Sequence, residues 1–468
     1  MPSADSPSAA PLGARTYIAV AVATVLLNLP LLANPGFFSH DEWQFHDIVT
    51  LSGLLKFIDG FGRLSSGSSF GVPVRPLGFV QLGLTTFGMD SFPLAPHAFN
   101  VLLHAVVVLV FARVLNLAGF HRLTATLAAL LFATSPLAAF ATGWTAASFD
   151  QWYTLFVLLA LLCALTIRGQ GYSAIRIALL FLVSAAALLS KETGIIAPVA
   201  VAGGSLALDL LRGTSIRWKT AAALGAVSAA PFLFYVPIRA QAIVASLHQT
   251  GGAYTPSIRN VPYNALTYFA FPFLPNVGEL VTGMPIAMLD WVAALAIHGA
   301  IVACLAWRYG WRGGLAYFFF YYVFLLPVLT IQSVGSHYLY ASGLALAAGL
   351  ACLIADASAP RMIAPAALLG IPAAGVLVWH FAMLQDKLYG DGVCQRAFLT
   401  SLDTQIESNG DTAVVIHPAQ DAKWWVGARA VFERPRYPNV RFVMDDPKTT
   451  ANYTMNADCH VVAMHARH

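Results

Sequence analysis

Apolar runs as long as a bilayer span recur along most of this 468-residue chain. A helix needs about 20 apolar residues to cross the hydrocarbon core, and only helices or closed barrels satisfy their backbone there. The chain is 58% hydrophobic and 10% charged, whereas soluble domains carry about 25% charged residues. The sequence therefore predicts an all-α polytopic membrane protein. About eleven spans are expected, at residues 16–33, 97–117, 123–142, 148–167, 174–190, 195–211, 221–238, 286–307, 315–330, 338–354 and 362–383.

The composition divides the chain into three parts. Residues 1–15 are small, polar and Pro-rich, and predict a disordered cytoplasmic tail. Residues 16–384 form the transmembrane domain, with a long first outer loop at 34–96. Charged residues become frequent after 384, so residues 385–468 predict a small soluble α/β domain. Its expected elements are strands near 413–416, 440–444 and 460–463, and a helix within 422–432.

The distribution of Lys and Arg predicts the orientation of the spans. With a cytoplasmic N-terminus, the short inner loops hold more Lys and Arg than the longer outer loops, as the positive-inside rule requires. An odd number of spans then places the C-terminal domain outside, which is the periplasm if the membrane is a bacterial inner membrane. Cys394 and Cys459 both fall in this domain and are a disulfide candidate; two free thiols are the alternative. The net charge of +4 is small, and no nucleic-acid partner is expected.

An acidic pair follows the first span almost at once. Asp41 and Glu42 lie between His40 and Trp43, and acids beside a membrane boundary are costly to desolvate, which makes them functional candidates. Alternatively, they begin an interfacial helix at 42–57, where the helix dipole favours acids. Adjacent side chains diverge by about 100° in a helix. The two carboxylates should therefore have different roles.

Further polar residues fall on the same predicted side. Lys191 ends the fifth span, either as a phosphate-binding cation held by a neighbouring acid or as a lysine that extends to the headgroups. Arg75 and Arg239 are further phosphate candidates, because guanidinium groups bind phosphate in a bidentate manner. The other polar and aromatic residues on this side are Trp144, Asp150, Glu192, His337, Tyr338 and Tyr340. Any chemistry is therefore expected to face outward.

His97, Asn100 and His104 share one face of the second span, because they lie three and four residues apart. In lipid such a face must be paired inside the bundle. Hydrogen bonds between helices are the expected role, and metal binding is the alternative. The cysteine and histidine spacings contain no pattern typical of a metal site.

Four short motifs occur in order on this side. They are Val74-Arg75-Pro76-Leu77, the His-x-x-Asn-x-x-x-His run at 97–104, Leu189-Ser190-Lys191-Glu192-Thr193-Gly194, and His337-Tyr338-Leu339-Tyr340. With the acidic pair and the long first loop, this set resembles the GT-C glycosyltransferases, and within them the protein O-mannosyltransferase-like branch. The resemblance covers about residues 26–349. The family has Glu-Arg where this chain has Ser336-His337, so phosphate binding by this element depends on a protonated His337.

The resemblance implies a GT-C-like fold and transfer of a sugar from a polyprenyl-phosphate donor. The acceptor would be a hydroxyl of a glycan, lipid or protein, at the extracytoplasmic face of the membrane, for example a cell-envelope glycan. No cofactor and no metal is expected. Alternatives are a GT-C-like glycan polymerase or ligase, and a non-enzymatic lipid or glycan transporter. A transporter should carry polar groups near the middle of the bilayer, whereas here they gather at the ends of spans.

The resemblance also implies a role for each candidate residue. Asp41 would be the general base, and Glu42 would position the substrate or a basic residue. Lys191, Arg75, His337 and Arg239 would bind the donor phosphate. The substrate would be lined by Glu192, Asp150, Trp144, Tyr338 and Tyr340, although Trp and Tyr also form ordinary interfacial belts.

Overall fold

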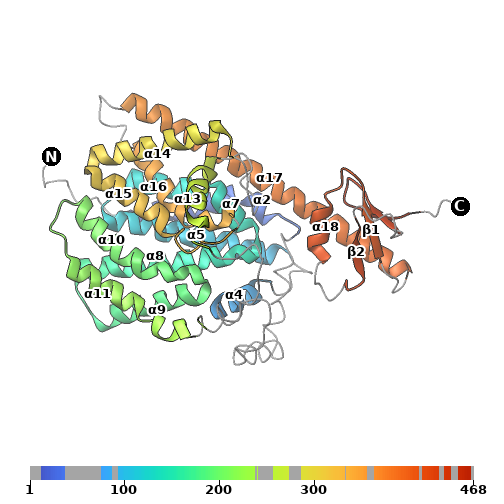
Figure 1. Cartoon of the computed structure of the whole chain (residues 1–468), viewed down its shortest axis with the longest axis horizontal. Helices are drawn as coiled ribbons and strands as arrows, with labels where there is room; N and C mark the ends of the chain where they lie inside the picture. Colours follow the sequence, from blue (N-terminus) through green and yellow to red (C-terminus); the bar gives the residue numbers. More distant parts are fainter. Residues whose placement is uncertain are drawn as a thin grey trace.

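The computed structural model describes residues 12–36, 75–86, 93–237, 240, 257–273, 286–332, 334–355, 363–409, 414–431, 437–443 and 452–464. These residues form a helical bundle, from which one long helix leads to a small sheet domain near the C-terminus (Figure 1).

The described part of the bundle is built from helices. Its α-helices are α1 (Ala14–Leu27), α2 (Leu29–Leu32), α4 (Pro76–Thr86), α5 (Leu94–Ala118), α6 (Arg122–Ala133), α7 (Pro136–Gly143), α8 (Ser148–Gln170), α9 (Ala174–Ser190), α10 (Ala197–Leu211), α11 (Trp218–Ala229), α13 (Asn260–Ala270), α14 (Met288–Tyr309), α15 (Trp311–Val323), α16 (Ser342–Ala355) and α17 (Ile363–Asn409). Its 3-10 turns are η4 (Thr145–Ala147), η5 (Glu192–Ile196), η6 (Phe271–Phe273) and η7 (Ser336–Leu339).

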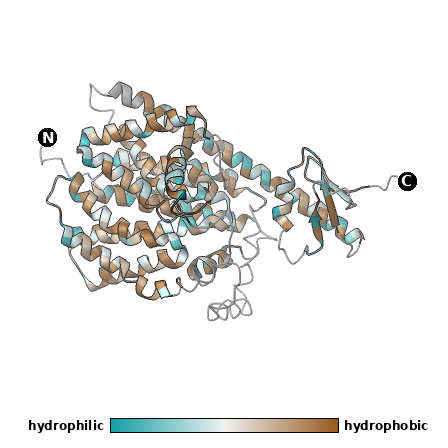
Figure 2. Ribbon diagram, in the orientation of Figure 1, coloured by the Kyte–Doolittle hydropathy of each residue, from teal (hydrophilic) through white to brown (hydrophobic). Residues whose placement is uncertain are grey.

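Every expected span overlaps a helix, but the number of full spans is not confirmed. Within the described residues, five helical segments are long and apolar enough to cross a membrane, or six if the bent pair α6 and α7 counts as one. α1, α9 and α16 are apolar but have only 10–17 residues. Figure 2 shows that most of the bundle ribbon is hydrophobic. The chain is therefore an integral membrane protein. The eleven expected spans outnumber the five or six described segments that are long enough to cross a membrane.

Polar residues inside the bundle hold helices together. His97 Nε2 lies 2.6 Å from the carbonyl oxygen of Gly36, and the Asn100 amide donates to the Thr142 carbonyl at 3.3 Å. His104 Nδ1 lies 2.8 Å from the Tyr340 hydroxyl. Asn100 and His104 thus bond to α7 and to the end of η7, as predicted, whereas His97 bonds to Gly36 in the segment after α2. Within the described residues, no group of three or more His, Cys, Asp or Glu side chains could hold a metal ion.

α4 packs against α9, and the approach is very close at Gly78. A Cβ atom at this position would collide with the carbonyl oxygen of Ser190 and with the ring of Phe149. The glycine therefore lets the start of α4 reach the end of α9.

The C-terminal domain contains a four-stranded sheet with the order β2-β1-β3-β4. The strands are β1 (Val414–Pro418), β2 (Val440–Phe442), β3 (Tyr453–Met455) and β4 (Val461–Ala463). β1 is parallel to β2 and to β3, whereas β3 and β4 are antiparallel. The sequence predicted β1, β2, β4 and the helix α18 (Trp424–Val431) but missed β3, which has only three residues.

The expected boundary between residues 384 and 385 falls inside α17. This 47-residue helix continues from the bundle to Asn409, and its Phe398 and Leu402 are buried in the core of the C-terminal domain. Cys394 of α17 is joined by a disulfide bond to Cys459, which lies between β3 and β4. The last third of the helix is thus part of the small domain.

Replacing both Cys394 and Cys459 by Ser should destabilise the C-terminal domain by about 3–4 kcal/mol, because the bond closes a long loop in the unfolded chain. The loop spans 65 residues. Limited proteolysis of the purified protein, with and without reductant, measures the effect on residues after α17. Cys163→Ser, which changes a half-buried free cysteine of α8, is the control. Equal protease resistance of the double variant and the control would contradict the stabilising role.

Candidate functional site

Four segments that are distant in sequence meet at one end of the bundle. Arg75 precedes α4, Asp150 lies in the first turn of α8, Lys191 joins α9 to η5, and Glu192 begins η5. η7 contributes His337 and the residues around it. The helical path breaks at Lys191, whose backbone is extended at φ −155° and ψ 143°. This break separates the directions of the Lys191 and Glu192 side chains.

Lys191 forms a buried ion pair with Asp150. The ammonium Nζ lies 2.6 Å from Asp150 Oδ1, and the two side chains are only 4% and 2% exposed. The ammonium also lies 4.9 Å from the ring centroid of Tyr338 and 6.0 Å from that of Tyr153. Aromatic faces attract a cation, the more so when water is excluded. The sequence predicted a neighbouring acid for Lys191, but the partner comes from another helix.

Arg75 and Glu192 form the second ion pair. Both Nε and Nη2 of Arg75 donate to the two carboxylate oxygens of Glu192, and both side chains are 29% exposed. The guanidinium carbon lies 5.4 Å from the ring centroid of Phe149. Because Glu192 directly follows Lys191, the two ion pairs lie side by side. The site therefore contains two cations and two carboxylates. The Lys191–Asp150 pair is buried, and the Arg75–Glu192 pair is partly exposed.

His337 is buried among aromatic rings. Its ring centroid lies 4.0 Å from that of Tyr338 and 5.2 Å from that of Trp144. Burial lowers the pKa of His337 well below its usual range, and the positive charges of Lys191 and Arg75 lower this pKa further. In the absence of a bound anion we therefore expect His337 to be neutral, and a neutral imidazole can still donate one hydrogen bond through its ring N–H group.

Several buried polar atoms around these residues lack a protein partner. Within the described part of the chain, no hydrogen bond reaches the hydroxyls of Ser148, Ser190 and Ser336 or Nδ1 of His337. Buried polar atoms are nearly always hydrogen-bonded, and exceptions need an explanation. These four belong to residues next to, or within two positions of, the members of the site. They can serve a polar ligand that enters it.

The remaining candidates fall into two groups. Tyr340 is fully buried, and its ring centroid lies 5.2 Å from that of Phe132, while its hydroxyl contacts His104. The structure thus uses Tyr340 for packing between helices and not for lining the site. Asp41, Glu42 and Arg239 lie outside the described residues, and their roles stay predictions.

Two site residues were missed by the sequence analysis. Phe149 and Tyr153 both come from the first turns of α8, on either side of Asp150 in sequence. A signal was present, because Asp150 and Tyr153 are three residues apart and share a helix face. Residue pairs with this spacing are common in apolar spans. The spacing alone therefore does not identify Tyr153 as a site residue.

Both ends of the segment that contains Asp41 and Glu42 are anchored at the bundle. Gly36 is held by His97, and Asn34 donates to the Leu388 carbonyl of α17 at 3.0 Å. Arg75 is held by Glu192. Asp41 lies five positions after Gly36 in the sequence, so their Cα atoms are at most about 18 Å apart.

Comparisons with known proteins find similarity only among solved structures. No protein-family profile and no curated protein matches the chain. The archaeal oligosaccharyltransferase AglB from Archaeoglobus fulgidus, in complex with an inhibitory peptide and a dolichol-phosphate, is 12% identical with a TM-score of 0.47, over 88% of this chain and 63% of AglB. ArnT from Cupriavidus metallidurans, bound to undecaprenyl phosphate, is 14% identical with a TM-score of 0.46, over 91% of this chain and 85% of ArnT. Apo ArnT is 15% identical with a TM-score of 0.45, over 92% and 85%.

Lys191→Met should lower the free energy of unfolding by about 3–5 kcal/mol, because it leaves Asp150 buried without a counter-charge. Lys191→Met combined with Asp150→Asn should recover most of this loss. Chemical unfolding in detergent measures these two variants and Asp150→Asn alone. Lys423→Met removes the partner of Asp391 at 3.1 Å, but Lys423 is 47% exposed, so this control should cost less than about 1 kcal/mol. Additive losses in the double variant would rule out a coupled pair.

Proposed function

We propose that this protein is a GT-C-type glycosyltransferase, which transfers a sugar from a polyprenyl-phosphate donor to an acceptor hydroxyl at the extracytoplasmic face. The observation that carries the proposal is the pair of cations, Lys191 and Arg75, among buried and unpartnered hydroxyls at one end of an apolar bundle. A phosphate on a lipid tail matches both features. The tail remains in the membrane while the charged group enters the site.

The two cations are suited to the leaving group of such a reaction. When the bond between the sugar and the phosphate breaks, negative charge grows on the phosphate oxygens, and preorganised cations stabilise this charge. Of the three ammonium donors of Lys191, one binds Asp150 among the described residues. The other two remain for a phosphate oxygen. Asp150 and Glu192 keep Lys191 and Arg75 charged and oriented before the donor binds.

The buried hydroxyls and aromatic rings complete the donor site. Ser148, Ser190 and Ser336 can donate hydrogen bonds to phosphate or sugar oxygens, and the neutral His337 can donate one through a ring N–H group. Trp144 and Tyr338 present ring faces beside His337, and such faces suit the apolar side of a sugar ring.

Asp41 is our candidate for the general base. It would take the proton from the acceptor hydroxyl while the oxygen bonds to the anomeric carbon and the polyprenyl phosphate departs. Glu42 would position the substrate or a basic residue, and Arg239 would add a third phosphate contact. The anchoring of Gly36 and Arg75 supports this assignment, because it holds both ends of the segment with Asp41 at the bundle.

The disulfide bond supports an extracytoplasmic position for the C-terminal domain, since such bonds persist in oxidising compartments. With the N-terminus in the cytoplasm, the site and this domain would share the outer side. Acceptors with a hydroxyl group, such as a glycan, lipid or protein, would reach the site from that side. No cofactor or metal takes part in the proposed reaction.

Asp41→Asn should lower kcat about 10²–10⁴-fold, as expected for loss of a general base. Lys191→Ala should lower kcat/KM for the donor, because a phosphate contact is lost. The assay incubates the purified protein with a panel of polyprenyl-phosphate sugars and measures release of polyprenyl phosphate. Lys219→Ala changes a lysine of α11 that lies over Trp218, away from the site, and should leave the rate unchanged. Full activity of Asp41→Asn would remove the base assignment.

His337→Phe should lower kcat/KM about tenfold, the effect of losing one hydrogen bond to a charged group. The shape of its pH profile should not change between about pH 6 and 9, because a neutral His337 does not titrate there. If a protonated His337 were needed, kcat/KM of the unaltered protein would fall as the pH rises through the histidine pKa. Disappearance of such a falling limb in His337→Phe would contradict the neutral imidazole.

A further inference from the structure

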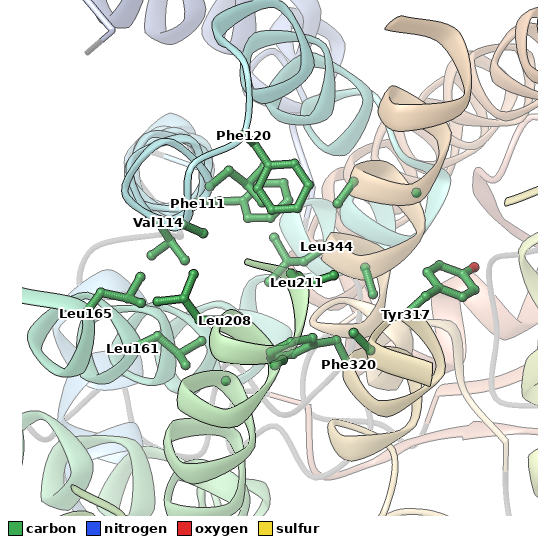
Figure 3. A pocket seen from close by; sticks show the side chains of 18 of the residues that line it. Phe111, Val114, Phe120, Leu161, Leu165, Leu208, Leu211, Tyr317, Phe320 and Leu344 are labelled. Atoms are coloured by element: carbon green, nitrogen blue, oxygen red, sulfur yellow. The ribbon is translucent and has the colours of Figure 1, made fainter. Parts of the chain in front are cut away.

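An apolar cavity of about 160 Å³ lies between α5, α8, α10, α14, α15 and α16. In Figure 3 the rings of Phe111 and Phe120 face the side chains of Leu161, Leu165 and Leu208 across it. Tyr317 contributes only its ring, because its hydroxyl points away and lies 2.7 Å from His298 Nδ1. Apolar cavities of this size stay dry and take hydrocarbon ligands.

The cavity reaches the end of the bundle that is opposite to the candidate site. Its walls include Ala118, Leu211 and Tyr309, which are the last residues of α5, α10 and α14. All three are half-buried and so lie near the surface. α8 connects the two ends, and the fifteen residues from Asp150 to Leu165 correspond to about 22 Å along its axis.

Arginine side chains gather at this end. Arg168 follows Leu161, Ala164 and Leu165 on the cavity face of α8, one turn beyond the wall. It pairs with Asp209, which follows the cavity residue Ser205 by one turn of α10. The Arg168 and Asp209 side chains are 2% and 1% exposed. Nε and Nη1 of Arg168 have no hydrogen-bond partner among the described residues.

Two further guanidinium groups lie next to this pair. Arg217 Nε is 3.5 Å from Asp209 Oδ1, and Arg212 Nη2 donates to the Leu117 carbonyl at 3.2 Å. Both also act electrostatically on Arg168. Two guanidinium groups thus share one carboxylate and a third acts on the same pair from nearby, and the positive charge exceeds what the helix C-termini nearby can balance, since each carries only about half a negative charge spread over its last turn.

We infer that this end of the bundle binds an anionic phospholipid of the bilayer, with part of one acyl chain in the cavity and the phosphate at Arg168, Arg212 and Arg217. A buried N–H group without a partner is costly, and phosphate oxygens supply the missing acceptors. An acyl chain fills the dry space. Basic pockets between transmembrane helices bind acidic lipid headgroups in this way. This site is separate from the proposed transfer reaction and does not depend on it.

The test uses the full-length protein, delipidated in detergent and titrated with phosphatidylglycerol or with phosphatidylcholine of the same acyl chains. Native mass spectrometry counts the bound lipid. One phosphatidylglycerol molecule should be retained more tightly than phosphatidylcholine. Arg212→Gln should weaken phosphatidylglycerol binding about fivefold, whereas Ser205→Phe should weaken both lipids by filling the cavity. Arg176→Gln changes an exposed arginine that binds Gln170 outside the cavity, and should have no effect.

Equal retention of the two lipids would overturn the inference, and so would unchanged binding in both Arg212→Gln and Ser205→Phe. If Ser205→Phe fails to fold, lipid binding by Arg212→Gln tests the inference alone, because Arg212 is exposed. Decaprenyl phosphate added at one equivalent separates this site from the donor site. Displacement of phosphatidylglycerol in both the unaltered protein and Lys191→Ala would show that the cavity holds the carrier lipid, and the inference would fail. Retention of phosphatidylglycerol supports it.

Discussion

The ion pair between Lys191 and Asp150 determines how one end of this bundle is built. An ammonium group in an apolar bundle must be paired, because an isolated buried charge is prohibitively costly. The pair fixes the end of α9 to the start of α8. Glu192 then pairs with Arg75, which orients α4. The same contact that stabilises the fold therefore places two cations beside the aromatic residues of η7, and the proposed phosphate site depends on this arrangement.

Much of the fold follows from the order of apolar residues, and the site does not. Each hydrophobic run that predicted a span overlaps a helix of the bundle. α9 begins and ends at the predicted residues. The bend of 50° between α6 and α7 has a local cause, Ser135 in an extended conformation before Pro136, but a single run of apolar residues hides it. β3 was missed because three residues carry too little periodicity. The pairing of Lys191 with Asp150, 41 residues apart, depends on how α8 and α9 turn toward each other, which a single sequence does not reveal.

The two ends of the bundle have opposite character. Among the described residues of the site, Lys191 and Arg75 each have a carboxylate partner, and the buried atoms without a partner are neutral hydroxyls and an imidazole nitrogen. At the other end, guanidinium groups outnumber the carboxylate that they share. The first arrangement suits the anion of the proposed reaction, which must bind and then dissociate. The carboxylates remain paired with the cations after the anion has dissociated. The second favours an anion that stays.

α17 has a consequence for the position of the C-terminal domain. The helix continues without a break from the bundle into the core of that domain, and the disulfide bond ties its surface to the sheet. A helix turns by about 100° for each residue. Asn34 donates a hydrogen bond to the Leu388 carbonyl on the bundle side, and Cys394 holds the sheet on the other side. The number of residues between Leu388 and Cys394 therefore sets the orientation of the sheet around the helix axis. Insertion of a single residue in this interval would carry the whole domain around to a different face of the bundle while leaving both cores intact.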